Sequence, residues 1–245
     1  MKQAKENNQN DQQKAAIEED DELHTQLISL FKLFISMKNC AVIVAHPDDE
    51  TLWAGGTILS NHKWRWLVVC LCRKSDENRK ERFKKAMSQL HAEGVMGDLD
   101  DGPDQKPMST EEIEQSILNL LPTTSFDRII THAPQGEYTR HLRHEETSIG
   151  VLNLWRSGKI ITKDLWLFAY SDHQKAHYPR PIEKATIYRT LSNKIWIEKY
   201  TIITDTYGFD PNSWEAQTTP RAEAFWQFKS SMEAENWLAH YKTQP

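Results

Sequence analysis

Two short stretches of the sequence carry most of the side chains that could do chemistry. The first is AHPDDE, in which His46, Asp48 and Asp49 directly follow an apolar run. Because histidine and carboxylate both ligate zinc, and a further carboxylate can act on a metal-bound water, this turn predicts a metal site. The alternative is that an aspartate only caps a helix while His46 packs in the core.

The second stretch, THAPQGEYTRHLRHEE, places His141 and His144 three residues apart. Residues at this spacing share one face of a helix, so both imidazoles can point at the same place. Four charged residues surround the pair, and a solvated, charged helix start is the alternative interpretation. Taken alone, neither stretch decides between a metal site and these structural roles.

Strands and helices alternate along most of the chain. Continuous apolar runs predict strands that are buried on both faces, as in a parallel sheet, and they span residues 40–45, 66–72, 127–133 and 164–170. Helical patterns begin near Glu50 and Ser109 and cover residues 76–93 and 144–157. This order predicts an α/β, Rossmann-like fold with a mostly parallel sheet and helices on both faces.

The two ends of the chain depart from this alternation. Residues 1–20 are polar and predict a disordered or frayed tail, whereas an amphipathic helix is expected to enter the domain from Asp21. Residues 206–228 predict a loop followed by a Trp-rich helix at AEAFWQF, which either lines the substrate cleft or straps the sheet. We expect a single domain over residues 21–245.

The two chemical stretches are expected to meet at one rim of the sheet. His46 and His132 each stand at the end of a predicted parallel strand, and His144 follows the second of these strands. The carboxyl ends of such strands share one rim, where ligands bind in open α/β folds. Three protein ligands and one open position form the pattern of a catalytic zinc site, with His144 completing the acidic turn.

Charge and cysteine content indicate which class of partner and which cellular compartment to expect. The formal net charge is −5 and the pI is about 6.1, which argues against a nucleic-acid partner because phosphate binding needs a basic surface. Three cysteines without metal-type spacing indicate a reducing compartment. No apolar segment has the length of a membrane span. We expect a cytoplasmic protein whose oligomeric state the sequence leaves open.

Three sequence elements together resemble the LmbE-like, or PIG-L type, N-acetylglucosaminyl deacetylase family: AHPDDE at 45–50, LDDG at 99–102 and ITHAPQGEYTRHLRH at 130–144. The resemblance covers about residues 38–230 and implies a Rossmann-like catalytic domain. By this resemblance, His46, Asp49 and His144 are the ligands of one Zn²⁺ per chain, or of another divalent metal.

The same resemblance implies roles for the other site residues. Asp48 matches the general base, and His141 matches the histidine that stabilises the oxyanion or donates a proton. Arg79 and Asp101 match substrate-binding positions. One departure is Arg143, which stands where members carry the carboxylate that orients this histidine. A cation there should favour neutral His141, which leaves its role as an acid open.

The function implied by the resemblance is a zinc-dependent hydrolase that removes an acetyl group from an N-acetylated sugar or sugar conjugate. Metal-activated water would attack the amide, with an aspartate as general base. Two alternatives remain: a non-catalytic carbohydrate-binding module on the same fold, and a metal-assisted phosphoesterase, which usually uses two metals. Metal content separates them, because the hydrolase requires one metal ion, the binding module none and the phosphoesterase two.

Overall fold

A computed structural model of the chain describes residues 37–102, 104 and 106–241. Residues Asn39–Pro245 belong to one compact unit. The tail predicted at 1–20 and the helix predicted from Asp21 lie outside the described residues. Within the described part, no helix has both the length and the apolar character needed to cross a membrane.

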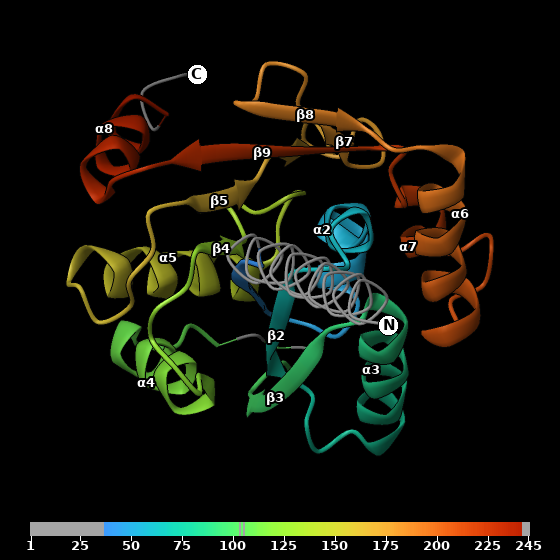
Figure 1. The fold of residues 1–245 in the computed structure, drawn as a ribbon, viewed down its shortest axis with the longest axis horizontal. Helices are drawn as coiled ribbons and strands as arrows, with labels where there is room; N and C mark the ends of the chain where they lie inside the picture. Colours follow the sequence, from blue (N-terminus) through green and yellow to red (C-terminus); the bar gives the residue numbers. More distant parts are fainter. Residues whose placement is uncertain (1–36, 103, 105, 242–245) are drawn as a thin grey trace, which may run out of the picture. The chain divides into compact units, whose positions relative to one another are not determined.

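A seven-stranded sheet in the order β3-β2-β1-β4-β5-β9-β8 forms the centre of this unit (Figure 1). Its strands are β1 (Asn39–Val44), β2 (Arg65–Cys72), β3 (Glu93–Leu99), β4 (Arg128–Thr131), β5 (Leu165–Phe168), β8 (Ile187–Thr190) and β9 (Ala222–Phe228). The first five strands in this order pair in parallel, and β9 and β8 continue the sheet antiparallel. This is the strand order of Rossmann-like folds, with the topological switch point between β1 and β4.

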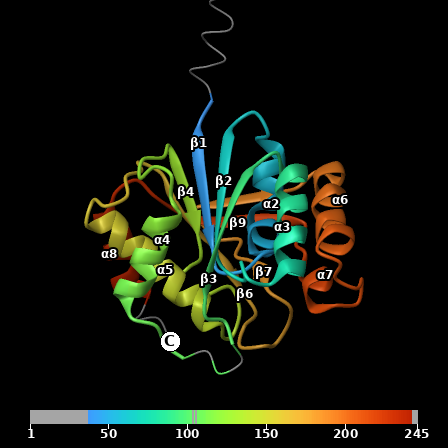
Figure 2. The same cartoon turned by 90° about the horizontal axis from the view of Figure 1, so that it is seen from below.

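Helices cover both faces of the sheet (Figure 2). One face carries α2 (Asp49–Ser60), α3 (Glu77–Leu90), α6 (Asn193–Thr201) and α7 (Trp214–Thr218); the other carries α4 (Thr110–Leu120), α5 (Leu142–Arg156) and α8 (Ser231–Tyr241). Successive side chains of a strand point to opposite faces. In β1, Val42 and Val44 therefore join the core under α2 and α3, whereas Ala41 and Ile43 join the core under α4 and α5. This two-sided burial explains the continuous apolar run and confirms the predicted fold class.

Smaller elements connect the parallel and antiparallel parts of the sheet. A separate two-stranded ribbon pairs β6 (Tyr170–Ser171) with β7 (Arg180–Pro181), and a π-helical turn at Ile202–Thr206 extends α6. The predicted start of α4 is confirmed: the Ser109 hydroxyl accepts the Glu112 N–H, and the Glu112 carboxylate accepts the Ser109 N–H. This reciprocal capping box satisfies two N–H groups at the helix start.

One prediction about elements is wrong, and one predicted helix is confirmed with an earlier end. Residues 222–228, expected to form a Trp-rich helix, are strand β9, which lies between β5 and β8. The helix expected over 76–93 ends at Leu90, and the edge strand β3 begins at Glu93. Neither difference moves the strands that carry the predicted site.

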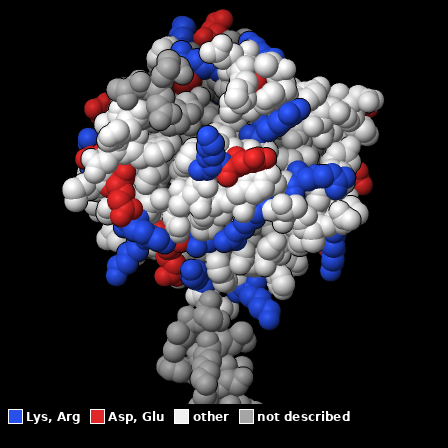
Figure 3. Space-filling model, turned by 90° about the horizontal axis from the view of Figure 1, so that it is seen from above, with Lys and Arg blue, Asp and Glu red and all other residues white. Residues whose placement is uncertain are grey.

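The surface carries charge of both signs. On the face shown in Figure 3, Lys and Arg side chains lie interspersed with Asp and Glu side chains and with uncharged ones. This mixture fits the sequence, which contains 30 Lys and Arg against 35 Asp and Glu.

Candidate metal centre

The two histidine-bearing stretches meet at the carboxyl ends of β1 and β4. These strands are neighbours, with Ile43 paired to Thr131, so the segments that follow them leave the sheet side by side. β1 ends at Val44, two residues before His46, and β4 ends immediately before His132. In Rossmann-like sheets this switch point is where ligands bind.

The turn between β1 and α2 does not use its aspartates to cap the helix. Asp48 occupies the N-cap position, but its side chain makes no capping hydrogen bond. Its φ is 122°, a conformation that strains a residue with a side chain and that proteins keep mainly at functional sites. Asp49 turns back toward the strand, and its Oδ2 accepts the N–H of His46 at 2.8 Å. Both carboxylates are therefore directed to the rim of the sheet.

Three ligand atoms form a small triangle at this rim. His46 Nδ1 lies 3.1 Å from Asp49 Oδ2 and 3.1 Å from His144 Nε2. The third side of the triangle, from His144 Nε2 to Asp49 Oδ2, measures 3.3 Å. Tetrahedral zinc with bonds of about 2.0–2.1 Å keeps its ligand atoms about 3.3 Å apart. The three buried side chains therefore fit a zinc ion without rearrangement.

Two other sets of three residues also bring ligand atoms within 4.8 Å among the described residues: His46, His141 and His144, and Asp49, His132 and His144. The first set contains no carboxylate to balance a divalent cation. In the second, His132 Nε2 already accepts the backbone N–H of Ala45 at 3.1 Å. The triangle of His46, Asp49 and His144 is therefore the strongest candidate metal centre.

Glu137 orients one of these ligands, and the sequence reasoning did not single it out. It is fully buried, and its Oε2 lies 2.7 Å from His144 Nδ1 and 2.9 Å from His132 Nδ1. Burial would raise its pKa, but His132 and His144 lower that pKa to about 2, so Glu137 is a carboxylate. With this acceptor at Nδ1, His144 donates there and keeps the Nε2 lone pair for a metal.

Asp101 lies against the other histidine of the triangle. Its Oδ1 is 3.1 Å from His46 Nε2, and its Oδ2 accepts hydrogen bonds from the Arg73 guanidinium at 2.9 and 2.5 Å. Burial would raise the pKa of Asp101, but His46 and Arg73 hold it below its ordinary value. Asp101 therefore fits a carboxylate that orients His46, and its predicted contact with substrate stays a prediction.

Asp48 stands beside the triangle without belonging to it. Its Oδ2 lies 3.6 Å from Arg79 Nη1, and the Arg79 guanidinium lies 5.2 Å from the centre of the Phe209 ring. Burial and the adjacent Asp49 carboxylate raise the pKa of Asp48 well above its ordinary value. An aspartate in this state can accept and return a proton closer to neutral pH than an exposed one.

His141 completes a row of imidazoles. It is the N-cap residue of α5; its ring stacks on that of His144 with centroids 4.6 Å apart, and meets that of His46 edge-on at 4.5 Å. Burial and these two imidazoles lower the pKa of His141 to about 3. The neutral form matches the expectation, but it results from burial and from the neighbouring histidines, not from Arg143.

Arg143 binds backbone carbonyl groups, whereas it was expected to influence the charge of His141. Its buried guanidinium donates to the backbone carbonyl oxygens of Asp100 and Lys106 at 2.6 and 2.8 Å, and it pairs with Glu146. Arg143 thus anchors the loop that follows β3 onto α5. This loop includes Asp101, which lies against His46. Arg143, the departure from the family pattern, therefore helps to hold Asp101 in place.

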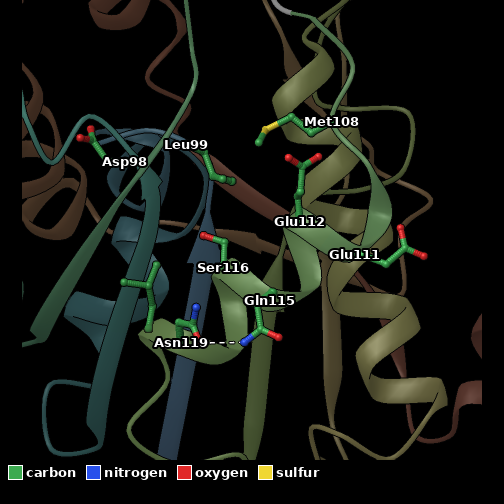
Figure 4. A pocket seen from close by; sticks show the side chains of 9 residues that line it. Asp98, Leu99, Met108, Glu111, Glu112, Gln115, Ser116 and Asn119 are labelled. Atoms are coloured by element: carbon green, nitrogen blue, oxygen red, sulfur yellow. Dashed lines mark hydrogen bonds between the residues drawn. The ribbon is translucent and has the colours of Figure 1, made fainter.

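A separate cavity of about 680 Å³ lies between β3 and α4 (Figure 4). None of the predicted site residues lines it. Its polar side chains are partly engaged with one another: Glu112 with Ser109, and Gln115 with Asn119 at 2.8 Å. This pocket is therefore separate from the candidate metal centre at the sheet rim.

Part of the chain matches a known family model. Residues 41–155 match the model of PIG-L, described as GlcNAc-PI de-N-acetylase. This segment of the chain is similar to the PIG-L family. The PIG-L match runs from β1 into α5 and so contains the metal triangle, Asp48 and His141.

One curated relative was matched over part of its length. The "Uncharacterized protein L374" of Acanthamoeba polyphaga mimivirus is 24% identical over 123 residues, which are 44% of this chain and 53% of the relative. The chain thus spans about half the length of the curated relative it matches.

Several solved structures share the fold. N,N′-diacetylchitobiose deacetylase from Pyrococcus horikoshii has a TM-score of 0.60 at 14% identity, over 80% of this chain and 86% of that one. The zinc-inhibited form of teicoplanin deacetylase Orf2 has a TM-score of 0.53 at 13% identity, over 77% and 97%. GalB, the 4-carboxy-2-hydroxymuconate hydratase from Pseudomonas putida KT2440, has a TM-score of 0.53 at 15% identity, over 77% and 95%. These likenesses show the fold alone, which carries a hydratase as well as deacetylases.

Proposed function

We propose that the protein is a metal-dependent hydrolase that removes the acetyl group from an N-acetylated sugar or sugar conjugate. The observation that carries this proposal is the triangle of His46, Asp49 and His144, with ligand atoms 3.1, 3.1 and 3.3 Å apart. A second carboxylate, Asp48, stands beside the triangle with no capping role. The match of residues 41–155 to the PIG-L family model supports the same chemistry.

The three ligand residues would hold one zinc ion and leave its fourth position open. Zinc bound there supplies a Lewis acid that acidifies water and polarises an acyl oxygen. Glu137 and Asp101 each hold the outer nitrogen of one ligand histidine. Partners of this kind fix the ring orientation and raise the basicity of the ligand.

Asp48 would act as general base and then as acid. Its carboxylate takes a proton from the attacking water and returns it to the nitrogen of the departing amine, so that water and amide become a carboxylic acid and a free amine. Arg79 lies 3.6 Å from this carboxylate and would keep it turned toward the open side of the triangle.

His141 would stabilise the oxygen of the amide as it gains negative charge. Its ring is in contact with both ligand histidines, so it would lie beside a metal held in the triangle. A neutral imidazole there can donate one hydrogen bond to a developing oxyanion. A divalent cation in the triangle disfavours a second proton on this ring, so we assign His141 to the oxyanion and Asp48 to both proton transfers.

The experiment measures acetate and free amine released from N-acetylglucosamine and N,N′-diacetylchitobiose by the zinc-loaded protein. Activity should vanish with a chelator and return with zinc. Asp48→Asn should keep one equivalent of zinc and lose about a thousandfold in kcat, since general acid–base catalysis contributes on the order of 10²–10⁴. Asp49→Ala should lose the zinc itself.

The matched control is Asp205→Asn, a carboxylate on the surface outside the centre, which should change neither zinc content nor rate. Full activity in Asp48→Asn would refute the assignment of the base. Tight sugar binding without any hydrolysis would favour the non-catalytic binding module instead. Two zinc equivalents per chain would favour the phosphoesterase.

A further inference from the structure

Trp214 is an exposed aromatic side chain beside the metal centre. Within the described residues, it is the tryptophan that keeps a large exposed fraction, 36%, whereas Trp53, Trp66 and Trp166 are buried. Its ring meets that of Tyr138 edge-on with centroids 4.7 Å apart. Tyr138 in turn lies 5.4 Å from the ring of His144, so two ring-to-ring steps connect Trp214 to a metal ligand.

A second path leads from the metal centre to the same indole. The ring of Trp53 lies 6.4 Å from that of Trp214, and Trp53 Nε1 donates to Asp49 Oδ1 at 3.1 Å. Trp53 is completely buried and belongs to the core. Trp214 therefore packs on the rings of Tyr138 and Trp53, which in turn contact the candidate ligands His144 and Asp49.

The segment that carries Trp214 is firmly held. The Tyr207 hydroxyl donates to Glu50 Oε1 at 2.7 Å, directly behind the acidic turn. The Ser213 N–H donates to the Asp210 carbonyl at 2.7 Å, and the Ser213 hydroxyl caps α7, whose first residue is Trp214. The indole is thus presented at a fixed place, which removes most of the entropy cost of using it to bind a ligand.

We propose that Trp214 is the platform on which the sugar ring of the substrate stacks while its acetamido group reaches the metal centre. This proposal rests on the deacetylase function proposed above. A pyranose ring has a face of C–H groups and a rim of hydroxyls, so a flat indole can cover the face and leave the rim to water. Arg79, which lies beside Asp48 and Phe209, would offer a hydrogen-bond donor to the hydroxyl rim.

The test compares sugar binding and turnover in variants of the full, zinc-loaded chain. Trp214→Ala should raise the KM for N-acetylglucosamine about tenfold, the upper end for an aromatic contact, and leave kcat within threefold. Trp214→Phe, which keeps a flat ring, should stay within threefold of the parent in both constants. In the Asp48→Asn background, calorimetry should show the same tenfold loss in affinity without turnover.

Two controls separate stacking from general damage. Tyr188→Ala removes an aromatic ring of similar exposure from the edge strand β8 and should leave the KM unchanged. Acetate, which occupies only the acyl position, should inhibit Trp214→Ala and the parent with the same inhibition constant. An increase in the acetate constant would mean that the substitution had disturbed the metal centre, and would overturn the platform.

Three further outcomes would overturn the platform, and the last of them would overturn the deacetylase proposal as well. An unchanged KM in Trp214→Ala would overturn the platform and leave the deacetylase proposal standing. Equal losses in Trp214→Phe and Trp214→Ala would overturn it too, because a flat ring would then not be the feature that binds. A parent protein that neither binds nor hydrolyses N-acetylated sugars would overturn both proposals together.

Discussion

Glu137 links two imidazoles through one carboxylate oxygen. Its Oε2 is within hydrogen-bonding distance of Nδ1 of both His132 and His144, and its Oε1 accepts the Ala133 N–H at 3.2 Å. This arrangement fixes which nitrogen of His144 carries the proton. The metal-binding nitrogen is therefore set by a residue that would itself never touch the metal.

We predict that Glu137→Gln weakens zinc binding by about 10- to 100-fold, the usual cost of losing an outer-shell carboxylate. A glutamine has the same shape but lacks the charge that holds both N–H groups. Competition with a chromophoric chelator measures the affinity, and circular dichroism checks the fold. Glu111→Gln, on the exposed side of α4, is the matched control. Equal affinities in all three proteins would contradict the role given to Glu137.

The sequence identified the residues of the candidate centre better than the residues that orient them. The structure brings His46, Asp48, Asp49, His141 and His144 to one rim, and their strand-end positions had predicted this meeting. Glu137 lies in an irregular loop, where no periodicity tells which way a side chain points. Its role depends on how that loop folds back onto β4, which is a tertiary property.

Among the elements, β9 was misjudged because its composition favours a helix. Alanine, glutamate and glutamine in AEAFWQF are good helix formers, but packing against β5 and β8 decides the outcome. The edge strand β3 was missed because EGVMGDL is short and contains two glycines. One of them, Gly97, is required: a Cβ there would lie 2.7 Å from the Leu71 carbonyl oxygen of the neighbouring strand.

The misjudged strand also carries a buried ion pair that joins three elements. Glu223 of β9 and Lys199 of α6 are both fully buried, with Nζ and Oε1 2.7 Å apart. The same carboxylate accepts the backbone N–H groups of Gly56 and Thr57 in α2, each at 2.7 Å. One side chain thus fixes α2, whose first turn bears the acidic residues, against the antiparallel part of the sheet.

We predict that Glu223→Gln lowers the free energy of unfolding by about 3–5 kcal/mol, because it leaves the charge of Lys199 buried without a partner. Urea denaturation measures this change. Glu81→Gln breaks the pair between Glu81 and Lys84, whose side chains are 57% and 60% accessible, and should cost far less because water screens the pair. A similar decrease in the free energy of unfolding in both variants would show that the effect does not depend on burial of the ion pair.

At the scale of the whole molecule, the metal centre lies outside the main cores. The two cores on either side of the sheet are built from apolar side chains of the strands and helices. The ligands of the triangle come instead from segments beyond the ends of β1 and β4. The fold should therefore persist without metal, while bound metal adds stability by mass action.

We predict that zinc at about one hundred times its dissociation constant stabilises the protein by about 2.7 kcal/mol, seen as a rise in Tm. The chelator-treated protein should still unfold cooperatively. Asp49→Ala should show no rise in Tm with zinc, but it should still unfold cooperatively. A chelator-treated protein with no cooperative unfolding would contradict this view of the fold.

The pairing of β1 with β4 has a consequence for protein synthesis. His46 and His144 are separated by 98 positions in the chain, so a growing polypeptide exposes the acidic turn long before its last ligand leaves the ribosome. Until β4 has docked and α5 has formed, the turn offers one imidazole and carboxylates, too few groups to retain zinc firmly. If the triangle binds a metal as proposed, its loading would therefore wait for the second half of the sheet to fold.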